Sequence, residues 1–99
     1  MPAPMGSINP DWPLASFASG LQALKRESRL TYRQMAGLAH FSRASLSAAA
    51  RGRELPTLQV TMAYVRVCNG PVSEWRRRWE AARDRLIADR SHEDGDARG

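Results

Sequence analysis

The chain has 99 residues, 42% of them hydrophobic, so it can bury one modest core but not two. Its net charge of +5 comes from 14 arginines and one lysine against 10 acidic residues, which favours an anionic partner: nucleic acid before an acidic membrane surface or an acidic protein. A single cysteine excludes an internal disulfide, and no apolar run is long enough for a signal peptide or a membrane-spanning helix, so we expect a cytoplasmic protein.

The two ends of the chain differ in composition from the middle. Residues 1–15 contain four prolines, which predicts an irregular N-terminal arm. Residues 91–99 are polar, acidic and glycine-bearing, which predicts a disordered tail. The folded domain is therefore expected over residues 16–90. This domain is more basic than the whole chain, because the acidic tail lowers the total charge.

Apolar spacing and capping residues predict five helices and no strand in the middle of the chain. Phe17, Leu21 and Leu24 recur at helical spacing on one face of the first helix. Thr31 and Gln34 have the spacing of a capping box at the start of the second. The helices are expected at about Ser16–Ser28, Tyr32–Ala39, Arg43–Ala50, 58–69 and Ser73–Asp89. The fold class is therefore all-α, a compact five-helix bundle.

The second and third predicted helices are short and lie close together in the sequence. Only His40 and Phe41 separate the second helix from Ser42, the expected N-cap of the third. Two short helices joined by a tight turn make a helix-turn-helix. In that motif the first helix crosses the DNA backbone and the second reads bases in the major groove.

The run "LTYRQMAGLAHFSRASLSAAARGRELPTL", residues 30–58, resembles the Cro/C1-type (xenobiotic-response-element, XRE) helix-turn-helix family of bacterial, actinobacterial-like proteins. The resemblance extends over roughly residues 16–70. It implies a lambda-repressor-like bundle that binds double-stranded DNA, usually as a two-fold dimer. The matching positions are Leu30-Thr31, Met35-Ala36, Phe41-Ser42, Leu46, Ala49, Arg51-Gly52 and Pro56-Thr57.

The third helix is unusual for a recognition helix because most of its side chains are small. Ala48 and Ala50 stand where such domains often place larger polar residues, so we expect a short or relaxed recognition site. Arg43 alone has the reach and fork geometry for a guanine edge. The residues expected to read bases are Arg43, Ala44, Ser45, Ser47 and Ala48. Those expected to contact phosphate are Thr31, Tyr32, Arg33, Ser42, Arg51 and Arg53, although Tyr32 could equally serve packing.

The last predicted helix carries an apolar stripe with two tryptophans. Its members recur every three or four residues: Val72, Trp75, Trp79, Ala82 and Leu86. The stripe can close the core of the bundle, or Trp75, Trp79 and Leu86 can form a homodimer interface. Both can hold if the first half packs inward and the second half pairs.

The sequence contains no constellation typical of an enzyme. His40, Cys68 and His92 are scattered and do not have the spacing of a metal site, and we expect no cofactor and no small-molecule ligand. The leading hypothesis is therefore a double-stranded DNA-binding protein, a bacterial transcriptional regulator. The alternatives are a nucleoid-associated protein that coats DNA, and a protein-interaction module that has kept the scaffold without DNA binding.

Overall fold

The computed structural model describes the backbone of residues 14–98 and the side chains of residues 14–88. Five helices follow one another in this range, with no strand among the described residues: α1 (Ala15–Ser28), α2 (Tyr32–Ala39), α3 (Arg43–Ala49), α4 (Leu58–Val67) and α5 (Val72–Arg98). The predicted all-α, five-helix fold is therefore confirmed. The arm predicted for residues 1–15 lies outside the described residues except for Leu14 and Ala15, and Leu14 is buried in the core.

Two helix ends differ by more than one residue from those expected. Helix α4 stops at Val67 because Asn69 adopts a left-handed conformation, with φ 61°, and the N–H of Gly70 donates to the carbonyl of Val65 at 2.8 Å. Helix α5 does not stop near Asp89 but continues to Arg98, through most of the segment for which we expected a disordered tail. That segment contains no proline, and its one glycine inside the helix, Gly95, lowers helix propensity without breaking the helix.

Helices α1, α4 and the first half of α5 pack together around the aromatic part of the core. The rings of Phe17 and Trp75 meet edge to face, with centroids 5.5 Å apart. Gly20 lets the Trp75 ring approach the backbone of α1, because a Cβ at position 20 would lie 2.6 Å from the Trp75 side chain. The indole N–H of Trp79 donates to the carbonyl of Pro56 at 2.8 Å, which fixes α5 against the start of α4. Both predicted tryptophans therefore bind α5 to its own bundle.

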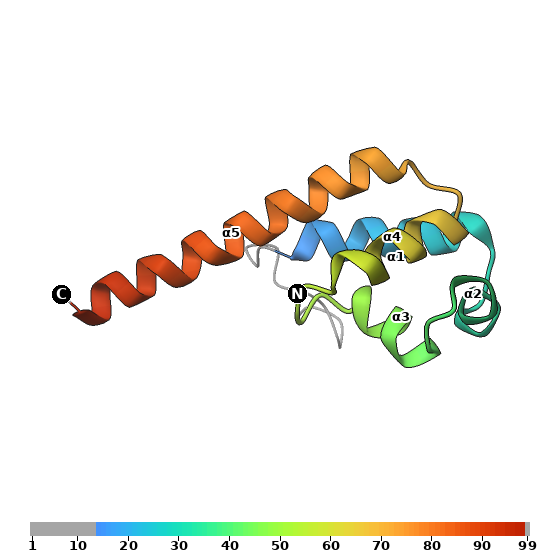
Figure 1. Ribbon diagram of the computed structural model, residues 1–99, viewed down its shortest axis with the longest axis horizontal. Coiled ribbons are helices and arrows are strands. Elements are labelled where there is room, and N and C mark those ends of the chain that lie inside the picture. Colours follow the sequence, from blue (N-terminus) through green and yellow to red (C-terminus); the bar gives the residue numbers. More distant parts are fainter. Residues whose placement is uncertain (1–13, 99) are drawn as a thin grey trace, which may run out of the picture.

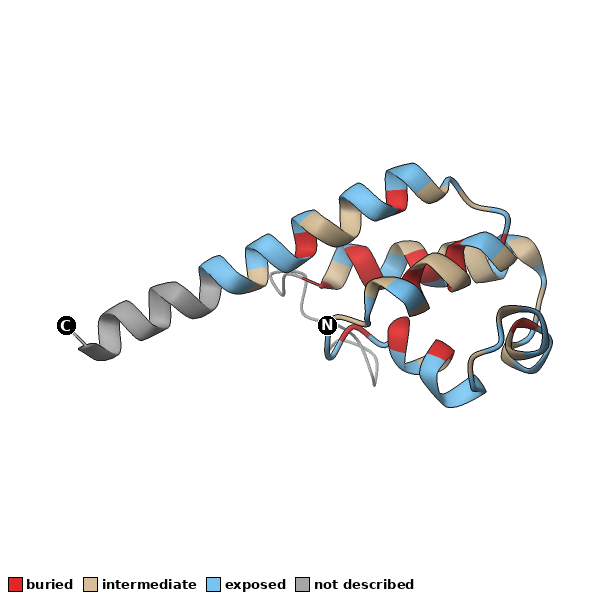
Figure 2. Ribbon diagram, in the orientation of Figure 1, coloured by how far each residue is buried: buried red, intermediate tan, exposed pale blue. Residues whose placement is uncertain are grey.

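Helices α2 and α3 form a second layer on the side of α1 and α4 that is away from α5 (Figure 1). Met35 of α2 and Leu46 of α3 are fully buried, and Ala49 and Ala50 join them in the core. The burial pattern shows the buried positions turned toward the centre of the bundle and exposed ones on its outer sides, on α5 as well as on α3 (Figure 2). Among the described residues, no helix is both long and apolar enough to cross a membrane.

Candidate nucleic-acid interface

The turn between α2 and α3 is tight and defined by its backbone. His40 ends α2 in a left-handed conformation, with φ 63°, and its N–H donates to the carbonyl of Ala36 at 3.1 Å. Ser42 then starts α3, and its hydroxyl accepts from the N–H of Ser45 at 3.0 Å. Phe41 is half-buried between them against the core. The two helices thus meet in the geometry that the sequence predicted.

The outward face of α3 is nearly flat, because its side chains are small apart from that of Arg43. Arg43, Ala44, Ser45 and Ala48 are exposed, whereas Ser47 is half-buried. Ala50, which stands where such domains often place a larger polar residue, is only 2% exposed and belongs to the core. Helix α3 ends at Ala49, one residue before the predicted end, and Ala50 is its C-cap.

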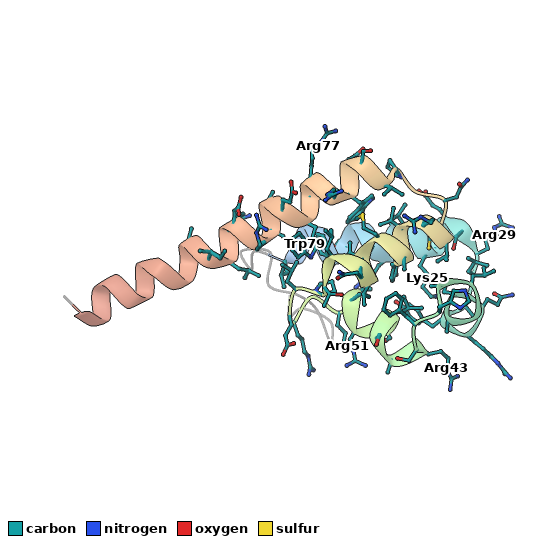
Figure 3. All side chains as sticks on the ribbon, in the orientation of Figure 1. Lys25, Arg29, Arg43, Arg51, Arg77 and Trp79 are labelled. Carbon is teal, nitrogen blue, oxygen red and sulfur yellow. The ribbon has the colours of Figure 1, made fainter. Side chains whose placement is uncertain are left out.

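Arginines stand at both ends of this flat face. Arg43 and Arg51 point outward from the two ends of α3 on the lower edge of the molecule (Figure 3). From Arg29 to Arg53 the chain carries five arginines and no acidic residue. The ion pairs of residues 14–88 are Arg76–Glu80 and Arg83–Asp84, both on α5, so none engages these five arginines. The α2–α3 unit is therefore the part of the chain best suited to a polyanion.

The capping hydroxyls predicted to contact phosphate already have partners. Thr31 accepts from the N–H of Gln34 at 3.1 Å, and the Gln34 side chain accepts from the N–H of Thr31 at 2.9 Å, which completes the capping box. Ser42 donates to the hydroxyl of Ser45 at 3.0 Å as well as capping α3. Both residues remain exposed, but their first role is to fix where each helix begins.

Tyr32 takes part in packing rather than standing free at the surface. Its hydroxyl lies 3.4 Å from that of Tyr64 on α4, and the Nζ atom of Lys25 lies 4.6 Å above its ring. Burial and this contact raise the pKa of Tyr64, so that hydroxyl stays protonated. The contact joins the start of α2 to α4 and brings Lys25 beside the α2–α3 unit.

Sequence reasoning missed one residue that positions α3. The side chain of Gln22 on α1 donates from Nε2 to the carbonyl of Ala50 at 2.7 Å. This bond holds the C-terminal end of α3 against α1 and satisfies a carbonyl beyond the helix. No local pattern could have identified it, since the two residues are 28 positions apart in the chain.

The three residues predicted for a dimer interface divide between two environments. Trp75 is 2% exposed and lies in the core of its own chain, so its ring is not available to a partner. Trp79 and Leu86 are half-buried against that core. Every member of the stripe from Val72 to Leu86 is buried or half-buried against the core, so the stripe closes the bundle along this whole length.

A family model described as a helix-turn-helix domain matches residues 16–78. The chain belongs to the helix-turn-helix domain family. The match includes α2, α3 and the turn between them, and it continues into α5 as far as Arg78. Searches of curated proteins and of solved structures gave no match.

Membership of the helix-turn-helix family supports double-stranded DNA as the partner of this chain. Helix-turn-helix domains of this kind are typically not enzymes. Among the described residues, no three His, Cys, Asp or Glu side chains gather closely enough to hold a metal ion. The residues that read bases and the ones that contact phosphate remain predictions.

Proposed function

We propose that this helix-turn-helix protein is a bacterial transcriptional regulator of the XRE type, which inserts α3 into the major groove of DNA and acts as a homodimer on the nucleoid. The observation that carries the proposal is the pair of exposed arginines, Arg43 and Arg51, at the two ends of an otherwise flat helix. Arg43 hydrogen-bonds a guanine edge, and Arg51 contacts phosphate together with Arg33 and Arg53.

The small side chains of α3 define the kind of recognition. A helix whose outward residues include Ala44, Ser45 and Ala48 can lie deep in the groove, where the alanines contact thymine methyl groups. Few hydrogen bonds to bases are then possible. The recognition site is therefore short, and much of the affinity comes from phosphate contacts and DNA shape.

The same flat face favours a second candidate function, a nucleoid-associated protein that coats many sites. With one long side chain on the outward face of α3, discrimination between sequences would be small relative to the non-specific term. The two candidates differ in the ratio of specific to non-specific affinity, which is large for a regulator and close to one for a coating protein.

The test is an anisotropy titration of random duplex DNA at several salt concentrations, followed by selection of bound sequences. A steep salt dependence with an enriched motif supports the regulator. A steep dependence without enrichment supports the coating protein. No binding at about 50 mM salt, where phosphate contacts are strong, would leave only a protein-interaction module.

Charge reversal with a matched control locates the DNA-binding face. Replacing Arg43→Glu together with Arg51→Glu should abolish binding to random DNA. The control, Arg76→Glu with Arg77→Glu, changes the net charge equally on the far side of the molecule, where Figure 3 places Arg77. It should weaken binding only through the change in overall charge. Equal losses in both variants would show that α3 is not the contact surface.

A further inference from the structure

Two arginines on one side of α5, Arg78 and Arg85, have no carboxylate partner. They are seven positions apart, which is two helical turns, or about 10 Å along the helix axis. The neighbouring carboxylates of Glu80 and Asp84 are paired with other arginines of α5. Within residues 14–88, neither Arg78 nor Arg85 takes part in an ion pair. Both guanidinium groups can therefore bind an anion from outside the chain.

These two arginines border a hollow between the start of α1 and the part of α5 that packs against it. The hollow has a volume of about 210 Å³. The described residues that line it are Ser16, Phe17, Arg78, Ala81, Ala82 and Arg85. Phe17 and Ala82 are buried and form an apolar base, whereas Ala81 and Arg85 are exposed at the rim. The hollow thus combines an apolar surface with two cationic side chains.

The core of the bundle holds Arg78 in place. Its Cζ atom lies 4.0 Å from the centroid of the Trp75 ring, which is itself buried. On the side of α1, a Cβ added at Gly20 would lie 3.1 Å from a terminal nitrogen of Arg78, so the guanidinium lies against the α1 backbone. Because this side chain is already half-buried and oriented, it loses little conformational freedom when an anion binds.

The size and chemistry of the hollow define the ligand that fits it. A cavity of about 150 Å³ holds one benzene ring. The hollow, at about 210 Å³, therefore has room for a ring and a single carboxylate. A guanidinium matches the planar geometry of a carboxylate, and an apolar ring gains from contact with the base of the hollow. The first turn of α1 contains no acidic side chain that would repel the anion.

We propose that this hollow, for which the sequence contained no signal, is a binding site for a small aromatic carboxylate. The ring of the ligand lies against Phe17 and Ala82, and its carboxylate is bound between Arg78 and Arg85. No local pattern could have predicted the site, because it forms only where α1 and α5, which are distant in the chain, pack together.

Other occupants use only part of the hollow. An inorganic anion, or a phosphate of the DNA backbone, would leave the apolar base in contact with water. A neutral ring would leave both arginines without a counter-charge. A helix of a partner protein, about 10 Å across, is too wide for a hollow of this volume. An organic anion of the size of benzoate satisfies both the base and the rim.

The test is an NMR titration of the full chain with benzoate, with benzamide and inorganic phosphate as comparisons. Benzoate should shift the backbone amide signals of Ser16 and of the α5 turns from Arg78 to Arg85, with a Kd of about 1 mM or lower. Benzamide, which has the same ring without the charge, and phosphate, which has charge without the ring, should each bind at least about tenfold more weakly. The hollow lies on the α5 side of the bundle, away from α3 (Figure 1), so the titration needs no DNA and its outcome is independent of DNA binding.

A substitution at the exposed rim tests the charge without touching the core. Position 81 lies three residues after Arg78 and four before Arg85, so Ala81→Glu places a carboxylate beside both arginines. This carboxylate pairs with the arginines and repels the ligand, so benzoate affinity should fall by at least about fivefold. The matched control, Ala81→Gln, adds nearly the same bulk without charge and should lower affinity by no more than about twofold. Both residues favour helix, so the fold should be retained.

A second pair of variants compares arginines inside and outside the site. Arg85→Ala should lower benzoate affinity by at least about tenfold, because a charged hydrogen-bonding partner is lost. Arg77→Ala removes an equal charge from a residue that does not line the hollow, and should leave the affinity within about twofold.

Several results would overturn the proposal. They are the absence of a shift at about 10 mM benzoate, equally tight binding of benzamide or phosphate, and shifts centred on α2 and α3 instead of the hollow. Equal effects of Ala81→Glu and Ala81→Gln, or of Arg85→Ala and Arg77→Ala, would overturn it as well.

Discussion

Helices α3 and α5 differ in the size of the side chains that they carry and in what those side chains contact. Helix α5 carries two tryptophans whose rings and N–H group bind it to α1 and to the start of α4. Helix α3 carries one large apolar residue, Leu46, which is buried, and presents mostly small side chains outward. The α1–α4–α5 half therefore holds the aromatic part of the core, and the α2–α3 half is the one that we propose contacts DNA. Substitutions in one half should leave the property of the other nearly unchanged.

The largest effect is expected from Trp75→Ala. The ring fills the space between Phe17 and Gly20 and is 2% exposed, so its removal leaves a cavity that the rigid aromatic neighbours cannot fill. Urea denaturation should show a loss of about 3–5 kcal/mol in the free energy of unfolding. DNA affinity, measured where the variant is still folded, should change little. A loss below about 1 kcal/mol would contradict the division between the two halves.

The matching change on α3 is Arg43→Ala. The exposed side chain contributes little to the fold, so the unfolding free energy should stay within about 0.5 kcal/mol of the unchanged chain. Affinity for a selected DNA site should fall by about 1–3 kcal/mol, because a bidentate guanine contact is lost. Affinity for random DNA should fall much less. An equal loss on both DNAs would assign Arg43 to phosphate rather than to base readout.

A smaller effect on stability is expected from Trp79→Phe. The substitution keeps most of the apolar contact but removes the indole N–H that donates to the carbonyl of Pro56 at 2.8 Å. Loss of this hydrogen bond should lower the unfolding free energy by about 1–2 kcal/mol. The control is Trp79→Leu, which removes the same donor and more contact area, and which should be less stable than the phenylalanine variant. No change on Trp79→Phe would mean that packing alone holds α5 against the start of α4.

Alkaline pH should weaken the junction between the two halves. Burial and the hydrogen bond to Tyr32 raise the pKa of Tyr64 above the ordinary tyrosine value of about 10. The folded state therefore holds this proton more tightly, so its contribution is complete below about pH 10 and is lost as the pH rises further. Burial likewise raises the pKa of Cys68, whose contribution begins to fall from about pH 9.

The slope of the unfolding free energy against pH tests whether Tyr64 carries this effect. Each such group should lower the unfolding free energy by about 1.4 kcal/mol per pH unit inside its window. The measurement is urea denaturation between about pH 8 and 11, with Tyr64→Phe as the control that removes the tyrosine contribution. The same slope in Tyr64→Phe would show that the Tyr32–Tyr64 contact does not carry the alkaline effect.

The smallest effect, and a gain in stability, is expected at the turn that joins α2 to α3. His40 is held at φ 63°, a conformation that glycine adopts without steric cost. The change His40→Gly should raise the unfolding free energy by about 0.5–1 kcal/mol in thermal or urea denaturation. Gly37 offers the contrast, because it lies inside α2 with nothing within 4 Å of an added Cβ, so Gly37→Ala should stabilise through helix propensity instead. If His40→Gly destabilises the protein, the imidazole has a structural role at the turn.

The sequence by itself determined the helices and the motif. The hydroxyl caps at Thr31, Ser42 and Thr57 and the apolar spacing act within a few residues, so their consequences can be read locally, and α2 occupies the predicted range. The helix-turn-helix likewise follows from two short helices and a two-residue turn. The basic character of the segment from Arg29 to Arg53 needs no structure at all, since it is a matter of composition.

Only the tertiary structure decided how several side chains are used. Tyr32 was open between phosphate contact and packing until Tyr64, 32 positions away, was found beside it. Trp75 was open between core and interface until Phe17 and Gly20 were found around its ring. The bond from Gln22 that holds the end of α3 had no sequence signal. In each case the deciding partner is distant in the chain, and local patterns of propensity and spacing contain no information about which distant residues will meet.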